Sequence, residues 1–186
     1  MSYFKHFPKI NYGNNSVVNI TKRVRVLEEL KQSPLAYLSY FVKDDDTPDN
    51  IAYYYYNDPY KVWLVYLAND IIDPYTQWPK KEYDFQEYFK QKYKALSGEN
   101  GLEILNWGRK TTITDNIVYY ENIENPEIRL NKYTYLNDAS VNVAEWNAVR
   151  YYQYEERLNE QKRNIFLIDR KYADRIEKEL EEILNG

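Results

Sequence analysis

The sequence predicts an α+β protein with a β-α-α-β core, and three observations lead to that prediction. Tyr40 to Val42 is a short run of residues that favour β-structure. Two helix-start signals, Thr47-Pro48 and Asp58-Pro59, follow it closely. The last segment, Ala173 to Leu184, places its apolar residues on one helical face. Together they indicate a small core with a mixed β/α C-terminal extension.

Residues 1–34 are expected to form an extended N-terminal arm and a lead-in to the core. Phe4, Phe7, Pro8 and Ile10 are many apolar residues for a solvated tail, and few signals of regular structure accompany them. We therefore expect the arm to dock on another surface. A frayed terminus is the alternative.

The central unit, Ser39 to Pro74, reads as strand, two short helices and strand. Tyr40 to Val42 forms the first strand, and a polar turn closes it. Thr47 can cap the first helix, where Pro48 occupies the first helical position without losing a hydrogen bond. The next start signal follows so soon that this helix must stop near Asn57.

A second helix is expected from about Tyr60 to Ala68. Its positions are apolar or aromatic except for Lys61, so the helix must be covered on more than one side. Either the rest of this chain or a partner surface in an assembly can supply the cover. Asn69 and Asp70 end the helix, and Ile71 to Pro74 supply a short strand and a turn.

The central unit resembles a LysM domain. Tyr40 to Lys43 stand at its first strand, Asp46, Thr47, Ile51 and Ala52 at its first helix, and Asn69, Asp73 and Pro74 at the close of its second helix. The resemblance implies a LysM-like core and, as one function, the binding of peptidoglycan glycans. Two departures favour protein contacts instead. Asp44 and Asp45 replace the usual glycine, and the Trp63 to Leu67 run is more apolar than a free-standing sugar-binding module needs.

The core segment is taken as residues 35–95, because a further helix follows Trp78 and Pro79. Phe85, Phe89 and Tyr93 recur at the i, i+4 spacing of one helical face. Glycines and polar residues after Ser97 then mark a loop.

Residues 96–186 are expected to form the C-terminal extension. Leu102 to Trp107 and Ile117 to Tyr120 are predicted as strands. Asn142 with Glu145 is a possible capping pair for a helix carrying Trp146 and Val149, and a long hairpin from Val141 to Ile168 is the alternative. Asn164 to Ile168 is predicted as a strand, and an amphipathic helix ends the chain.

Composition excludes several classes of function. The chain has no cysteine, so thiol chemistry, disulfides and thiolate metal sites are absent. His6 is the sole histidine and lies in the arm, so we do not expect a histidine-based catalytic triad. The aspartates from Asp44 to Asp49 lack the glycine and distal glutamate of a calcium loop, and no carboxylate pair stands in a glycosidase context. We expect neither an enzyme nor a cofactor.

Charge and hydropathy limit the partners. A formal charge of −4 argues against a dedicated nucleic-acid surface, and glutamates such as Glu155 interrupt the basic residues between Arg150 and Lys171. Neither a signal peptide nor a membrane span is recognisable, so we expect synthesis in a cytoplasm and no membrane partner. The 22 tyrosines suit interfaces, because the ring offers much contact area at little entropy cost. An AT-rich genome would also enrich tyrosine.

Seen whole, the chain resembles the baseplate wedge proteins of T4-like contractile-tailed bacteriophages. The segments that carry the resemblance are Tyr3 to Ile10, Asn19 to Val24, Asp58 to Trp63, Asn69 to Pro74, Gln77 to Pro79 and Asn159 to Ile165. The resemblance implies a non-enzymatic virion component, assembled in the host cytoplasm, that clamps neighbouring wedges of a sixfold baseplate by protein contacts. The implied partners are other baseplate wedge and central tail proteins.

Eight residues are the candidates for contact with those partners. They are Phe4, Phe7, Pro8, Ile10, Tyr60, Trp63, Trp78 and Arg163. A structural clamp is the expected function, and a LysM-type glycan-binding module is the alternative.

Overall fold

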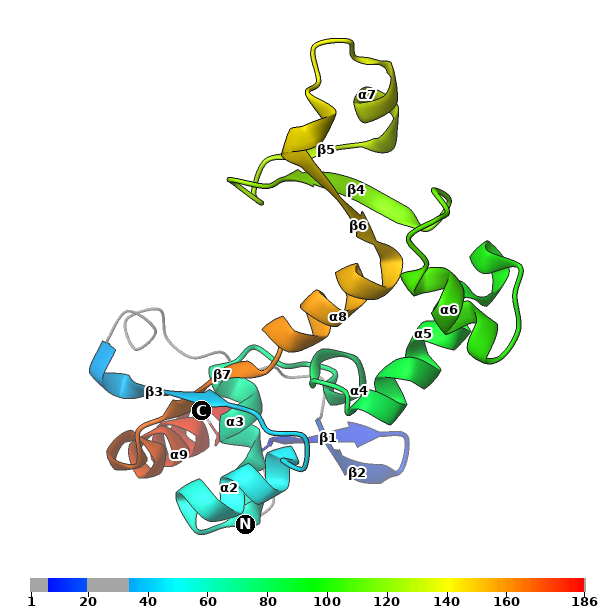
Figure 1. The fold of residues 1–186 in the computed structure, drawn as a ribbon. Helices are drawn as coiled ribbons and strands as arrows, with labels where there is room; N and C mark the ends of the chain where they lie inside the picture. Colours follow the sequence, from blue (N-terminus) through cyan, green and yellow to red (C-terminus); the bar gives the residue numbers. More distant parts are fainter. Residues whose placement is uncertain (1–6, 20–33, 186) are drawn as a thin grey trace. The chain divides into compact units, whose positions relative to one another are not determined.

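A computed structural model describes residues 7–19 and 34–185 of the chain (Figure 1). The chain divides into two compact units: unit 1 comprises Met1–Pro79 with Lys162–Gly186, and unit 2 comprises Lys80–Gln161. Helices and small antiparallel sheets are mixed in the described residues, which confirms the α+β class. No helix among the described residues is long and apolar enough to cross a membrane.

The sheet of unit 1 joins two segments that lie far apart in the sequence. After a 3-10 turn at Pro34–Ala36, strand β3 (Tyr37–Phe41) pairs antiparallel with β7 (Asn164–Ile168), as Figure 1 shows. Leu38 lies opposite Leu167, and Tyr40 lies opposite Ile165. Both predicted strands are therefore present, and each is the other's partner.

The strand predicted at Ile71 to Pro74 is wrong. Ile71 and Ile72 form no regular structure, and helix α4 (Pro74–Gln77) follows directly. The Asp73 side chain accepts a hydrogen bond from the Tyr75 N–H at 3.0 Å, and proline occupies the first helical position. This Asx-Pro signal starts a helical turn and so competes with extended structure.

The two predicted core helices are confirmed. Helix α2 (Pro48–Tyr56) ends where Asn57 adopts a left-handed conformation with φ of 58°, and Thr47 precedes it without a side-chain capping bond. The Asp58 side chain accepts from the Tyr60 N–H at 2.8 Å and starts the 3-10 turn η3 (Pro59–Lys61), which leads into α3 (Val62–Ala68).

This chain covers the apolar helix α3 from two sides. Trp63 and Leu64 pack in one cluster with Phe7, Ile168 and Ala173. Val65 packs in a second cluster, whose other buried members are Val42, Ile51, Ala52, Ile165 and Leu167. This chain itself therefore supplies the cover for Trp63, Leu64 and Val65.

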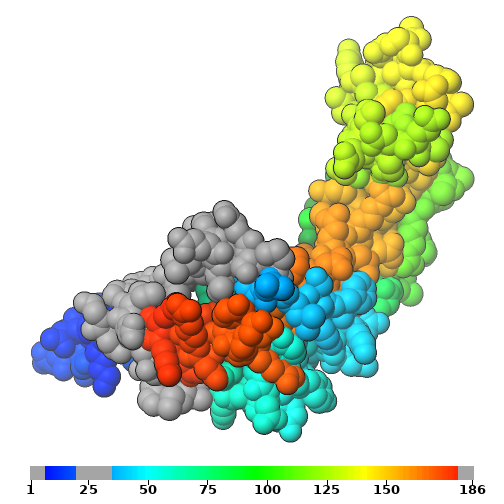
Figure 2. All heavy atoms as spheres, turned by 90° about the vertical axis from the view of Figure 1, so that its left-hand side faces the viewer, coloured from blue at the N-terminus to red at the C-terminus, as the bar shows by residue number. Residues whose placement is uncertain are grey.

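Two further elements complete unit 1. Strands β1 (Lys9–Tyr12) and β2 (Asn15–Val18) form a hairpin, which turns at Gly13 with φ of 60°, a conformation that favours glycine. The terminal helix α9 (Arg170–Asn185) agrees with the predicted amphipathic helix, and Figure 2 shows it in red at the surface of the unit. The Lys61 ammonium lies 2.8 Å from the Asp174 carboxylate and ties η3 to α9.

Unit 2 contains a helical core. Helix α5 (Glu82–Ser97) carries the predicted Phe85, Phe89 and Tyr93 face, and all three rings are buried. They pack with Ile104 and Leu105 of α6 (Leu102–Arg109) and with Tyr152 of α8 (Tyr151–Gln161).

The strand predicted at Leu102 to Trp107 is wrong, because these residues form α6. Ile104, Leu105 and Gly108 are its buried positions, and this i, i+1, i+4 spacing is helical rather than alternating. The run contains too few residues to separate the two periods without knowing that the α5 face lies against it.

A small sheet completes unit 2. Strand β4 (Ile117–Asn122), which confirms the prediction there, lies between β5 (Arg129–Leu130) and β6 (Trp146–Arg150), with helix α7 (Lys132–Asn137) nearby in the chain. The helix predicted through Trp146 and Val149 is wrong. Asn142 does cap a turn by accepting from the Ala144 N–H at 3.3 Å, but only the 3-10 turn η4 (Val143–Glu145) follows before β6 pairs with β4.

Candidate interaction surfaces

Two of the predicted interface residues lie inside unit 1. Phe7 is 5% exposed and Trp63 is 7% exposed, and both belong to the cluster that also contains Ala173 of α9. The described end of the arm therefore docks on this chain. Phe4 lies outside the described residues.

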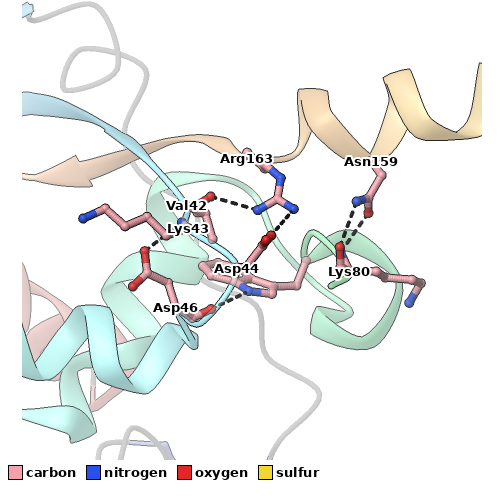
Figure 3. Close-up of polar contacts among 8 residues, drawn as sticks. Val42, Lys43, Asp44, Asp46, Lys80, Asn159 and Arg163 are labelled. Atoms are coloured by element: carbon pink, nitrogen blue, oxygen red, sulfur yellow. Dashed lines mark hydrogen bonds and ion pairs between the residues drawn. The ribbon is translucent and has the colours of Figure 1, made fainter. Parts of the chain in front are cut away.

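Arg163 holds the acidic turn after β3 in place (Figure 3). Its guanidinium donates to the Val42 carbonyl at 3.1 Å and to the Asp44 carboxylate at 2.6 Å, and the residue is 9% exposed. Trp78 contributes to the same corner, since its Nε1–H donates to the Asp46 carbonyl at 3.4 Å. Both predicted residues thus have structural roles within unit 1.

The Asp46 carboxylate closes the acidic turn from within. It accepts from the Tyr40 hydroxyl at 2.8 Å and from the Lys43 N–H at 2.8 Å. Burial, reinforced by the hydrogen bond to Asp46 and by its negative charge, raises the pKa of Tyr40 to about 12. The turn is an internally bonded corner. No group of three or more potential metal-ligating side chains is found among the residues that the structure describes.

The remaining predicted residues are more accessible. Ile10 is 43% exposed in β1, Tyr60 is 64% exposed in η3, and Pro8 is half-buried. Their contact with a partner stays a prediction.

Unit 1 exposes other large apolar side chains that the sequence analysis did not select. On or beside the sheet they are Leu35, Leu38, Phe41 and Phe166, and elsewhere in the unit they include Tyr12, Tyr53, Tyr54, Ile72 and Tyr75. Phe41 stands in the predicted strand Tyr40 to Val42, whereas Leu38 precedes it; with both residues in β3, the alternation of a strand places one of them on each face.

Unit 2 exposes a second set. Within residues 123–143, around β5 and α7, at least half of the surface of five large apolar side chains is exposed: Ile123, Ile128, Tyr133, Leu136 and Val143. Sequence reasoning missed this set. The available signal was the recurrence of isoleucine, leucine and tyrosine in a stretch with no helical or alternating apolar period.

Scattered apolar residues are normal on a protein surface, but sets of large ones mark contact surfaces. Each of the two units carries such a set. The ionisable side chains of the acidic turn after β3, Arg163 and Asp46, bond to groups of the same chain. These features define a structural protein of the kind that works by binding other proteins.

Comparison with known proteins gives the family. A family model described as "Base plate wedge protein 53" matches residues 3–177. The chain therefore belongs to the baseplate wedge protein 53 family. It is similar to "Baseplate wedge protein gp53" of Enterobacteria phage T4, with 29% identity over 118 residues, which is 63% of this chain and 52% of that relative. The match spans about half the length of that relative.

Membership makes the chain a structural component of the phage tail baseplate. The sequence-based expectation of a non-enzymatic virion protein is thereby confirmed.

Proposed function

We propose that the chain clamps neighbouring wedge subunits of the baseplate together through protein contacts. The observation that carries the proposal is the division into two units, each with its own buried core and its own set of exposed apolar side chains. A protein that holds two neighbours needs two binding surfaces, and each unit can supply one. The partners are other wedge proteins and central tail proteins, and several copies act within a sixfold assembly.

The exposed side chains are of the kinds that anchor protein interfaces. Tyr133 and Leu136 of α7 are 77% and 62% exposed, and Tyr60 of unit 1 is 64% exposed. Fully burying one such side chain contributes on the order of 1.5–3 kcal/mol. A few of them in one interface are enough to exceed the entropy cost of association.

A LysM-like core in unit 1 is part of this proposal. Strand β3, helices α2 and α3, and strand β7 follow one another in β-α-α-β order, and the two strands pair antiparallel. Unit 2 is inserted before the second strand. This order supports a LysM-like core that has accepted an insertion between its last helix and its last strand.

The glycan-binding alternative finds less support, because the LysM-like residues are occupied internally. Asp46 binds Tyr40 and the Lys43 main chain, Asp73 caps α4, and the Asn69 amide binds main-chain groups of Val65 and Phe166. Sugar recognition would have to break these contacts.

The clamp is tested with one double variant in each unit. Tyr133→Ala with Leu136→Ala removes the α7 anchors, and Ile10→Ala with Tyr60→Ala removes candidates of unit 1, while the exposed Glu127→Ala is the control. We expect either double variant, with an unchanged melting temperature, to abolish the joining of wedges into rings, as counted by electron microscopy. Normal ring formation by both would refute the clamp.

A peptidoglycan pull-down tests the alternative. Saturable binding that is lost when Asp46 or Asp73 is replaced by alanine in a folded chain would favour the glycan-binding module. We expect no saturable binding.

A further inference from the structure

The two outer edges of the β3–β7 sheet differ in whether side chains bond to their outward main-chain groups. In an antiparallel pair, alternate residues direct their main-chain groups toward the partner strand and away from it. The hydrogen bonds from the Val42 N–H to the Arg163 carbonyl and from the Asp169 N–H to the Ala36 carbonyl fix this alternation. Leu38 and Tyr40 therefore bond to β7, whereas the main-chain groups of Ser39 and Phe41 point outward.

Side chains seal the outer edge of β7. The Asn69 amide accepts from the Phe166 N–H and donates to the Phe166 carbonyl, both at 2.8 Å, as a neighbouring strand would. At Ile168, the next residue whose main-chain groups face outward, the Tyr56 hydroxyl donates to the carbonyl at 3.0 Å. An added strand on this edge would therefore find both main-chain groups of Phe166 and the Ile168 carbonyl already bonded.

The outer edge of β3 has no such seal at Ser39 and Phe41. In the described part of the chain no hydrogen bond joins the outward main-chain groups of Ser39 or Phe41 to another residue. Open edges of this kind are templates for strand addition, and soluble proteins normally block them. A sheet that blocks one edge with two side chains and leaves Ser39 and Phe41 open on the other edge is suited to pairing at these two residues.

The surroundings of the open edge indicate which strand fits. Leu38 is 49% exposed on the core side of the sheet, and Phe41 is 56% exposed on the other side. Phe166 of β7 lies on the same face as Phe41 and is 51% exposed. An added strand would cover apolar side chains on both faces, so its own residues beside β3 would be apolar. Arg163 bonds to Asp44, but the three carboxylates of Asp44 to Asp46 still outnumber the two cations of Lys43 and Arg163 directly after the strand, which favours a basic residue there.

We propose that the open edge of β3 binds an extended segment of another baseplate protein as a third strand. The segment carries apolar residues beside Leu38 and Phe41 and a basic residue beside Asp44 and Asp45. This inference rests on the proposed function. It specifies that one of the clamp's contacts forms by β-strand addition.

A second copy of this chain fits the edge less well. In an antiparallel pair of β3 strands, the turn that holds Asp44 would lie beside the start of the other copy's strand, where Pro34–Ala36 is a 3-10 turn. None of these three residues supplies a positive charge, and proline has no N–H to donate.

A proline substitution tests the edge without touching the existing sheet. Ser39→Pro removes an outward N–H that β7 does not use, and proline is tolerated on edge strands in this orientation. Ser39→Ala keeps the N–H and is the matched control. Both variants are expected to keep the melting temperature of the parent chain within a few degrees, as measured by circular dichroism.

The readout is incorporation of the full chain into wedges formed with the co-expressed wedge proteins of the same baseplate. We expect Ser39→Pro to weaken incorporation about tenfold or more, and Ser39→Ala to leave it unchanged. Equal incorporation of the two variants would overturn the proposal. A homodimer of the isolated chain that Ser39→Pro dissolves would also overturn it, because the occupant would then be a second copy.

Hydrogen exchange separates failure of this inference from failure of the clamp. In the isolated chain the amides of Ser39 and Phe41 should exchange rapidly, and in the assembled wedge they should slow about a hundredfold. If the chain enters the wedge while both amides still exchange rapidly, strand addition is refuted and the clamp stands. A chain that never enters the wedge contradicts both.

Discussion

Asparagine side chains replace missing main-chain partners at several points of the described structure. Asn69 bonds to both main-chain groups of Phe166, and Asn159 bonds in the same way to Lys80, accepting from its N–H at 2.8 Å and donating to its carbonyl at 2.9 Å (Figure 3). The buried Asn116 amide donates to the Trp107 and Lys110 carbonyls at 2.6 and 2.8 Å. Abundant asparagine therefore has a structural use here, since each amide presents a donor and an acceptor.

Removal of the Trp63 side chain is predicted to destabilise unit 1. The ring is 7% exposed and packs in the cluster that contains Phe7 and Ala173 of α9, so Trp63→Ala leaves a cavity and should lower the free energy of unfolding by about 3–5 kcal/mol. Urea unfolding followed by circular dichroism measures the loss. Tyr60→Ala, one turn earlier and exposed, should lower it by less than about 1 kcal/mol.

Trp63→Ala should also block incorporation into the wedge. A variant that remains folded and still fails to incorporate would show that Trp63 contributes to the interface as well as to the core. Normal incorporation of the folded variant would restrict Trp63 to the core.

The ion pair between Glu121 and Arg157 predicts a pH-dependent stability. Two hydrogen bonds from Arg157, at 2.6 and 2.9 Å, lower the pKa of Glu121 from its ordinary value of 4.5. A carboxyl whose pKa is lower in the folded chain stabilises the fold above its unfolded pKa, and this contribution disappears as the pH falls through the folded pKa.

Glu121→Gln should therefore lower the free energy of unfolding at pH 7 by about 1 kcal/mol, because the Arg157 side chain is 41% exposed and solvent screens the pair. The difference from the parent chain should shrink below pH 4.5 and be lost under more acidic conditions. Denaturant melts at several pH values measure it, with the exposed Glu124→Gln as control. A difference that is constant with pH would contradict the assigned cause.

At the scale of elements, packing decides what local propensity leaves open. Leu102 to Trp107 has the composition of a strand, yet it folds as α6 because its buried residues meet the α5 face. Trp146 and Val149 follow a genuine capping residue, yet they form β6, because β4 offers a row of main-chain partners. Short apolar runs fit both periods, and the neighbouring element selects one.

Gly108 is predicted to be required for the contact between α6 and α5. A Cβ atom at this position would lie 2.5 Å from Phe89 Cζ, and the Phe89 ring is fully buried. In an unobstructed helix, glycine to alanine stabilises by about 1 kcal/mol. Here Gly108→Ala should instead destabilise by about 1–3 kcal/mol, because the ring has no space into which to move.

Thermal unfolding of unit 2 measures the sign of this effect. Asn106→Ala, at an exposed position of the same helix, is the control and should change the stability little. A stabilised Gly108→Ala variant would mean that α5 and α6 pack less closely than the structure shows.

At the scale of the whole molecule, the chain is built as one unit inserted into another. Unit 1 is formed from residues at both ends of the chain, and unit 2 from the continuous stretch between them. The Asn159 amide holds the two ends of unit 2 together at Lys80. Insertions whose ends lie close together leave the host fold intact.

The fragment Lys80–Gln161 is therefore predicted to fold by itself. It contains the whole cluster around Phe89 and the sheet β5–β4–β6. We expect a cooperative thermal transition and dispersed amide resonances in solution. Asn159→Ala should destabilise the fragment by about 1–3 kcal/mol, because it leaves the main-chain groups of Lys80 without their partner. A fragment without a cooperative transition would show that unit 2 needs the rest of the chain.

The sequence by itself determined the local features of this protein. The ends of α2 and α3, the aromatic face of α5, the strand at Asn164 to Ile168 and the terminal helix all follow from caps, turns and periodicity within short windows. The baseplate wedge family was also recognisable, because the order and spacing of short segments extend along the chain.

Only the tertiary structure decided which segments meet. The sequence places the strand after the two helices at Ile71 to Pro74, directly after the second helix. In the structure β3 instead pairs with β7, which follows the whole of unit 2 in the sequence. No local signal specifies such a partner, because a strand's propensity records its fit to a pleated surface and not the identity of its neighbour. For the same reason, the sealed edge of β7 and the open edge of β3 became visible only once the two strands were paired.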